Sequence, residues 1–227
     1  ELGLIKLNDD PVRYARHPLV YIVEAADDIC YEIMDIEDAH KLKILDTAKT
    51  FELLLNFFDQ EKDASILKHK DEVFKEVTDT NERIAYLRAL VINKLVKETA
   101  DIFLTNYPNI MDGRYDSTLI KDLTGTSKEA FNICKDLAIR QIYNDSSVVK
   151  IELTGFNVLG TLLEEFVYAV RNPDYNYSTK LLSLLPQQFD IMRGSIYDKI
   201  RSVIDFISGM TDLYAVDLYK DIKGIRL

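Results

Sequence analysis

The scarcity of helix-breaking residues is the feature that most restricts how this chain can fold. Its 227 residues include only 8 Gly and 5 Pro, and so few breakers in a long chain favour helices over a turn-rich β fold. Apolar residues recur at intervals of three and four along most of the chain, whereas the alternation of a half-buried strand is almost absent. The sequence therefore predicts an all-α protein that is long enough to bury a proper core.

The predicted helices are separated by charged, Pro- or Gly-containing segments. They cover residues 19–42, 45–59, 81–105, 127–143, 156–171, 186–209 and 210–223. Pro18 suits the first turn of the first helix, where a missing N–H costs nothing. The buried stripe of that helix is expected to consist of Val23, Ala26, Cys30, Ile33 and Met34.

The remaining segments are expected to be short or irregular. Residues 1–15 and 107–122 are predicted to be irregular, 61–71 a loop or short helix, and 148–153 a short extended piece. Ser127 is a candidate helix cap, as are Thr211 and Asp212 after the helix break at Gly209. We expect one helical domain, residues 1–227.

Composition narrows the classes of partner. The net charge of −10 argues against a DNA-coating surface, yet a nucleotide substrate stays open because a bound metal reverses the local sign of charge. The two cysteines, Cys30 and Cys134, fit a reduced cytoplasmic protein rather than a disulfide framework. No apolar run has the length of a membrane span. Because the chain begins with Glu1 rather than Met, an upstream part is expected to be missing.

The first predicted helix carries an unusual acidic run. Residues 24–38 contain seven carboxylates, and no Lys or Arg follows until Lys41. Asp27, Tyr31 and Asp35 are four residues apart and share one face beside the apolar stripe. Such a face is usually a solvated one. Alternatively, one carboxylate reaches into a cleft, the phenol stacks on a ligand and the second carboxylate accepts a hydrogen bond from a hydroxyl.

The amino-acid sequences of two segments resemble those of a known family. Residues 16–31 (RHPLVYIVEAADDICY) closely resemble the last metal-ligand helix of deoxyguanosine triphosphate triphosphohydrolases, and residues 206–219 (FISGMTDLYAVDLY) resemble the same family's C-terminal signature. The two segments occur in the family's order and bracket nearly the whole chain. The resemblance implies the C-terminal portion of an HD-superfamily-type helical bundle, with residues 1–227 as a single helical fragment.

The resemblance also implies a reaction and roles for particular residues. Enzymes of this family use a divalent metal, Mg²⁺ or Mn²⁺, to hydrolyse a dNTP, here preferably dGTP, to the deoxynucleoside and tripolyphosphate. Asp27 matches a metal ligand, Tyr31 the residue that packs on the sugar and blocks a 2′-OH, and Asp35 the acceptor of the sugar 3′-OH. Tyr197 is a looser match to a further tyrosine near the sugar. Self-association is expected, whereas regulation by nucleic acid is not indicated.

The histidines depart from the family's pattern. The chain has no His-Asp dipeptide, and His17, His40 and His69 lack the ligand spacing. The first His, the His-Asp pair and the catalytic residues are therefore expected upstream of Glu1. By itself the chain is expected to be inactive, with its metal position unfilled. Two alternatives stay open: a non-catalytic helical module for oligomer contacts or regulatory nucleotide binding, and an HD phosphohydrolase acting on a different nucleotide.

Overall fold

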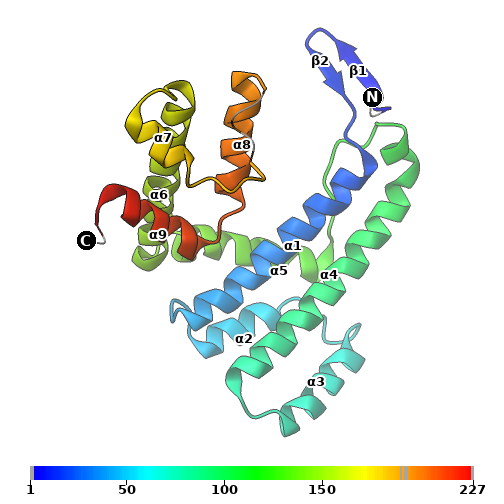
Figure 1. The fold of residues 1–227 in the computed structure, drawn as a ribbon. Coiled ribbons are helices and arrows are strands. Elements are labelled where there is room, and N and C mark those ends of the chain that lie inside the picture. The colour runs from blue at the N-terminus through cyan, green and yellow to red at the C-terminus, as the bar shows by residue number, and fades with distance from the viewer. Residues whose placement is uncertain (1–2, 190, 192–193, 226–227) are drawn as a thin grey trace. The chain divides into compact units, whose positions relative to one another are not determined.

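A computed structural model describes residues 3–189, 191 and 194–225 and shows a mainly helical chain (Figure 1). A short antiparallel hairpin, β1 (Lys6–Asp9) and β2 (Val12–Tyr14), comes first. The helices that follow are α1 (Pro18–Lys41), α2 (Thr47–Leu55), α3 (Ala64–Glu76), α4 (Thr80–Met111), α5 (Gly125–Leu137), the π-helical turn η1 (Ala138–Ile142), α6 (Ser146–Arg171), α7 (Asn176–Leu182), α8 (Ile196–Ser208) and α9 (Asp212–Lys223). The predicted all-α class is confirmed.

The chain groups into two compact units, residues 1–145 (unit 1) and residues 146–227 (unit 2). Each unit has its own cluster of buried apolar side chains. The prediction that residues 1–227 form one fragment of a longer fold stays a prediction. Within the described residues, no helix is both long and apolar enough to cross a membrane.

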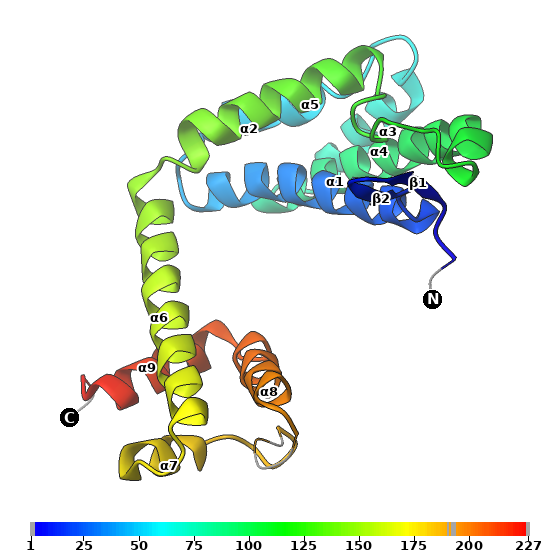
Figure 2. The ribbon, with the colours of Figure 1, turned by 90° about the horizontal axis from the view of Figure 1, so that it is seen from above.

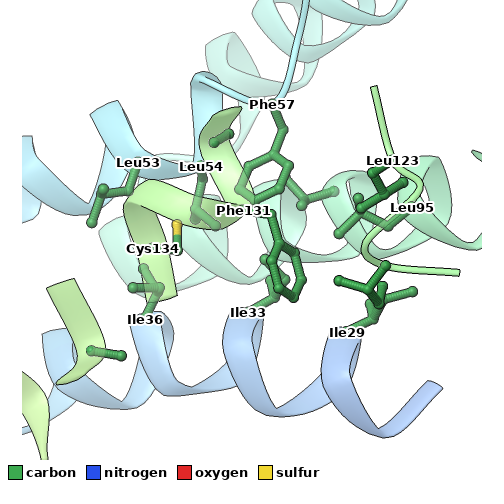
Figure 3. Close-up of a cluster of buried hydrophobic side chains, with 14 of the residues drawn as sticks. Ile29, Ile33, Ile36, Leu53, Leu54, Phe57, Leu95, Leu123, Phe131 and Cys134 are labelled. Carbon is green, nitrogen blue, oxygen red and sulfur yellow. The ribbon is translucent and has the colours of Figure 1, made fainter. Parts of the chain in front are cut away.

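The core of unit 1 lies between α1, α2, α4 and α5 (Figure 3). Ile33 and Ile36 point from α1 toward Phe131 and Cys134 of α5, and Ile29 points toward Leu95 and Leu123. Other fully or nearly fully buried members are Leu53, Leu54, Phe57, Leu95 and Leu123. Burying each such side chain contributes roughly 1.5–3 kcal/mol, so this packing fixes the orientation of α1.

The predicted buried stripe of α1 was wrong. Tyr21, Ala25, Ile29, Ile33 and Ile36 are buried, whereas the predicted members Val23, Ala26, Cys30 and Met34 are exposed and only Ile33 is buried. Helix α1 is apolar on two sides. Periodicity alone does not tell which side faces the core, because tertiary packing makes that choice.

Several predicted boundaries were also wrong. Residues 148–153 belong to α6, because a helical run overrides the weak β preference of Val148, Val149 and Ile151. Helix α4 continues through Pro108 to Met111, α3 extends to Glu76, and residues 6–14 form the hairpin instead of an irregular segment. The last long helix starts only at Ile196, where Ser195 and Asp198 form a capping box.

Of the predicted helix caps, Thr211 is confirmed and Ser127 was wrong. Thr211 caps α9, its hydroxyl accepting a hydrogen bond from the backbone N–H of Tyr214 at 3.3 Å, as predicted. Ser127 is buried inside the first turn of α5, and Thr124 holds the N-cap position instead. The helix therefore begins about one turn before the predicted cap.

Unit 2 is built around α6, which packs against α7, α8 and α9 (Figure 2). Phe166 of α6 meets Phe206 of α8 edge to face, with ring centroids 5.6 Å apart. Phe189, from the segment between α7 and α8, lies 5.4 Å from the same Phe206 ring. This aromatic cluster gives unit 2 a core of its own.

Candidate functional site

Residues close in sequence form the contacts at the two ends of helix α1. Pro18 occupies its first turn, and Nδ1 of His17 accepts a hydrogen bond from the backbone N–H of Leu19 at 3.2 Å. At the other end, Nε2 of His40 is 3.0 Å from the hydroxyl oxygen of Thr47. Both histidines thus make hydrogen bonds at the ends of the helix.

The predicted site residues of α1 lie on one continuous 24-residue helix. Asp27 is exposed, Tyr31 is 65% exposed, and Asp35 is half-buried. Asp35 comes eight positions after Asp27, which corresponds to about 12 Å along the helix axis. A ligand must therefore lie along α1 to contact both carboxylates.

Asp35 has a partner that the sequence did not indicate. The hydroxyl of Tyr143, just after η1, donates a hydrogen bond of 2.6 Å to Oδ2 of Asp35. Burial, and then this hydrogen bond and the charge of Asp35, raise the pKa of Tyr143, so the phenol stays a protonated donor. The π-helical turn before Tyr143 and the 108-residue separation left no signal in the sequence for this contact.

Glu32 is the second residue that sequence reasoning missed. It is only 8% exposed, and among the described residues its Oε1 has no hydrogen-bond partner. Burial, and then the charge of Asp35, raise its pKa to about 7, although the Lys135 ammonium works in the opposite direction. Near neutral pH Glu32 therefore carries a proton part of the time, which reduces the repulsion along α1.

Asp28 completes this acidic side of α1, which faces α5 and η1. Burial raises its pKa, opposed by the charge of Lys135. The positive charge of Lys135 thus offsets part of the repulsion among the carboxylates of α1. We call Asp28, Glu32 and Asp35 the acidic shoulder of α1.

The residues of this chain do not form a metal centre by themselves. Over the described part of the chain, no three or more His, Cys, Asp or Glu side chains are grouped so that they could hold a metal ion. Asp27 offers one exposed carboxylate, and metal sites need several converging ligands. A metal on Asp27 would need donors from outside this chain.

Tyr197 lies in unit 2, in the first turn of α8, and is 70% exposed. The structure describes unit 2 by itself. The proposed position of Tyr197 near the sugar therefore stays a prediction.

Comparisons with known proteins show which proteins this chain is similar to. Residues 123–221 match the model of the phosphohydrolase-associated domain. A deoxyguanosinetriphosphate triphosphohydrolase-like protein from Synechocystis is 35% identical to this chain, and the match covers 100% of the chain and 49% of the relative. A protein of the same description from Pseudomonas aeruginosa is 28% identical, over 99% of the chain and 50% of the relative.

A deoxyguanosinetriphosphate triphosphohydrolase from Cronobacter sakazakii is 26% identical, over 94% of the chain and 50% of its own length. The chain thus spans about half the length of the curated relatives that it matches. The matched part is the C-terminal half of each of them. The chain is a relative, over its whole length, of the C-terminal halves of deoxyguanosinetriphosphate triphosphohydrolase-like proteins.

Proposed function

We propose that this chain is the C-terminal half of a metal-dependent dNTP triphosphohydrolase, and that the outward face of α1 holds the sugar of the substrate. The full-length gene product that contains the chain is called the parent protein below. Its reaction is the conversion of dGTP and water to deoxyguanosine and tripolyphosphate. The chain by itself is inactive in this proposal, because the remaining metal ligands lie in the preceding half.

The hydrogen bond between Tyr143 and Asp35 carries this proposal. It engages Oδ2 of Asp35, and in this proposal the other carboxylate oxygen, Oδ1, accepts a hydrogen bond from a ligand hydroxyl. A side chain held by a second element is pre-organised for such a contact. The sugar 3′-OH is the hydroxyl that we assign to it.

Tyr31 and Asp27 take the other two roles. The exposed Tyr31 ring, one turn before Asp35, would lie against the sugar and leave no room for a 2′-OH, which selects deoxynucleotides by a clash. Asp27, one turn earlier, would be the ligand that this chain supplies to a divalent metal, Mg²⁺ or Mn²⁺, whose charge attracts the triphosphate.

The role of Asp35 is tested by comparing dGTP with 2′,3′-dideoxyguanosine triphosphate in the parent protein. We expect Asp35→Asn to lower kcat/KM for dGTP about 10- to 100-fold, because a hydrogen bond to a charged group contributes about 1.5–3 kcal/mol. The dideoxy substrate lacks the 3′-OH, so its kcat/KM should change little. Asp38→Asn removes an equal charge from an exposed position of α1 and should leave both substrates unaffected. An equal loss on both substrates in Asp35→Asn contradicts the assignment.

One observation favours a second candidate, a non-catalytic helical module for oligomer contacts or regulatory nucleotide binding. The described residues contain no complete metal-ligand set. This candidate predicts that the coding sequence upstream of Glu1 contains no His-Asp pair. It also predicts that nucleotide binding, if present, is not followed by hydrolysis.

A further inference from the structure

Glu32 is the buried member of the acidic shoulder. On a helix with 3.6 residues per turn, Asp28, Glu32 and Asp35 fall within an arc of about 60°. Glu32 is only 8% exposed, and among the described residues its Oε1 has no hydrogen-bond partner. Because a buried carboxylate without a partner is costly when it carries its charge, the packing around Glu32 favours the protonated form of this carboxyl group.

Charged neighbours on two helices act on Glu32. Burial is the largest cause that raises its pKa to about 7; the charge of Asp35 adds to the rise, Lys135 of α5 opposes it and Asp28 adds to it. Lys135 is exposed, so water screens its charge. Glu32 is therefore a carboxyl group that changes its charge in the neutral pH range, one turn before Asp35.

The elements that pack against α1 bring further ionisable groups near it. The charge of Glu32 also acts on Cys134 and Tyr143. Two cations come from the other helices, and each is paired with a carboxylate of its own: Arg88 of α4 with Glu37 at 2.9 Å, and Lys49 of α2 with Glu52 at 2.9 Å. Their positive charges are thus matched by carboxylates other than Glu32.

Asp35 connects Glu32 to the proposed sugar contact. Side chains three residues apart on a helix are neighbours, with Cβ atoms about 5–6 Å apart. An ionised Glu32 places a second negative charge beside Asp35 where little water reaches, and two such carboxylates repel each other. The repulsion acts on a side chain that Tyr143 holds through a single hydrogen bond of 2.6 Å. A neutral Glu32 leaves Asp35 in the orientation that this bond gives it.

We propose that Glu32 is a positioning residue for the hydrolysis of dGTP: with its proton in place it keeps Asp35 oriented to accept the sugar 3′-OH, and loss of the proton displaces Asp35. The inference rests on the proposed function and adds a residue that does not touch the substrate. The protonated fraction of Glu32 falls as the pH rises through about 7. Recognition of the 3′-OH should therefore weaken over the same range.

The ratio of kcat/KM for dGTP to kcat/KM for 2′,3′-dideoxyguanosine triphosphate measures this recognition. The two substrates share the base and the triphosphate, so other titrations cancel and only the 3′-OH differs. In the parent protein we expect the ratio to fall about 5- to 10-fold from pH 6 to pH 8, mainly through KM for dGTP, because part of a hydrogen bond to a charged group is lost. The midpoint of the fall should lie near pH 7.

Two variants and a control separate positioning from a purely structural role. Glu32→Gln is neutral at every pH, so its ratio should keep the value of pH 6 throughout. Lys135→Gln removes a charge that favours the ionised carboxylate and should move the midpoint to higher pH. The control Asp38→Asn also lies three residues from Asp35, but Asp38 has a 58% exposed side chain, so the fall should be unchanged. A purely structural role would affect both substrates alike and would not move the midpoint.

A ratio that stays constant from pH 6 to pH 8 in the unmodified parent protein overturns the proposal, as does an equal fall in Glu32→Gln. Carbon-13 NMR of the parent protein, with labelled Asp, Glu and Tyr, tests the same coupling without turnover. The Asp35 carboxyl and Tyr143 phenol signals should shift with the midpoint of the Glu32 carboxyl, and Glu32→Gln should abolish the shift.

The NMR result and the enzymatic result fail separately. A parent protein that hydrolyses no dNTP but shows the three signals moving together would retain the coupling of Glu32 to Asp35 and refute the proposed function. Signals of Asp35 and Tyr143 that stay constant while Glu32 titrates would refute the positioning role, even in a parent protein that hydrolyses dGTP.

Discussion

At the scale of single residues, the acidic shoulder shows how one helix presents carboxylates of different character. Asp35 accepts a hydrogen bond from Tyr143 and is half-buried. Glu32 is buried, and its carboxyl group keeps its proton up to about pH 7. Spacing along the sequence placed Asp27, Tyr31 and Asp35 on one helix. It did not show Tyr143 or the burial of Glu32, because both depend on α5 and η1, which are distant in sequence.

The contact between Tyr143 and Asp35 predicts a defect in substrate binding. Tyr143→Phe removes one hydrogen bond to a carboxylate and should lower kcat/KM for dGTP in the parent protein about 5- to 50-fold. We expect most of the change in KM, because the hydrogen bond orients Asp35 in both the ground state and the transition state. Steady-state kinetics measures this, with Tyr168→Phe, at a 50% exposed position of α6, as the control. Unchanged kinetics in Tyr143→Phe would show that Asp35 needs no positioning.

The raised pKa of Glu32 predicts a pH-dependent stability. Its pKa rises from 4.5 to about 7 in the folded chain, so the folded state binds a proton that the unfolded state has released in this window. Stability should therefore fall as the pH rises from about 4.5 to about 7, and this loss should stay constant above it.

Glu32→Gln stays neutral at every pH and isolates this effect. Urea denaturation should show the variant to be more stable than the unmodified chain by about 1–2 kcal/mol at pH 8, solvent screening included, and close to equal at pH 4. The control Glu152→Gln, at an exposed position of α6, should show no such difference between the two pH values. A Glu32→Gln variant that is less stable at pH 8 would mean that the carboxylate has a stabilising partner.

At the scale of elements, the sequence predicted helices well and their faces poorly. The stretch from Pro18 to Lys41 was expected to be helical and is, because apolar spacing, Pro18 at the start and the shortage of breakers agree. The choice between the two apolar sides of α1 was wrong. The packing of α2, α4 and α5 determines which side of α1 is buried, because these helices cover Ile29 and Ile33 and leave Val23 and Met34 exposed.

The end of α4 provides a test at this scale. Gly113 has a φ of +69°, and a Cβ there would lie 2.7 Å from Cβ of Ala15. Gly113→Ala should therefore destabilise unit 1 by about 1–3 kcal/mol. Gly155→Ala, inside α6 and in open space, should stabilise the chain by about 0.5–1 kcal/mol. Thermal melts of the two variants should move in opposite directions, and a stabilised Gly113→Ala would contradict the turn described here.

At the scale of the whole molecule, the chain consists of two compact units, each with a core of its own. Composition and length predicted neither the division after Asp145 nor the aromatic cluster around Phe206, because both arise from contacts rather than from a local pattern. The family could be predicted because residues 16–31 and 206–219 have sequences that are specific to it. Whether the chain binds a metal could not be predicted, because the described residues supply no complete ligand set.

Release of tripolyphosphate tests the central claim most directly. The parent protein, its Asp27→Ala variant and this chain alone would each be incubated with every dNTP and with Mg²⁺ or Mn²⁺. We predict release from dGTP by the parent protein, loss of at least about 1,000-fold in Asp27→Ala, and none from the chain alone. Turnover by the chain alone, activity retained in Asp27→Ala, or no release by the parent protein with either metal would contradict the account.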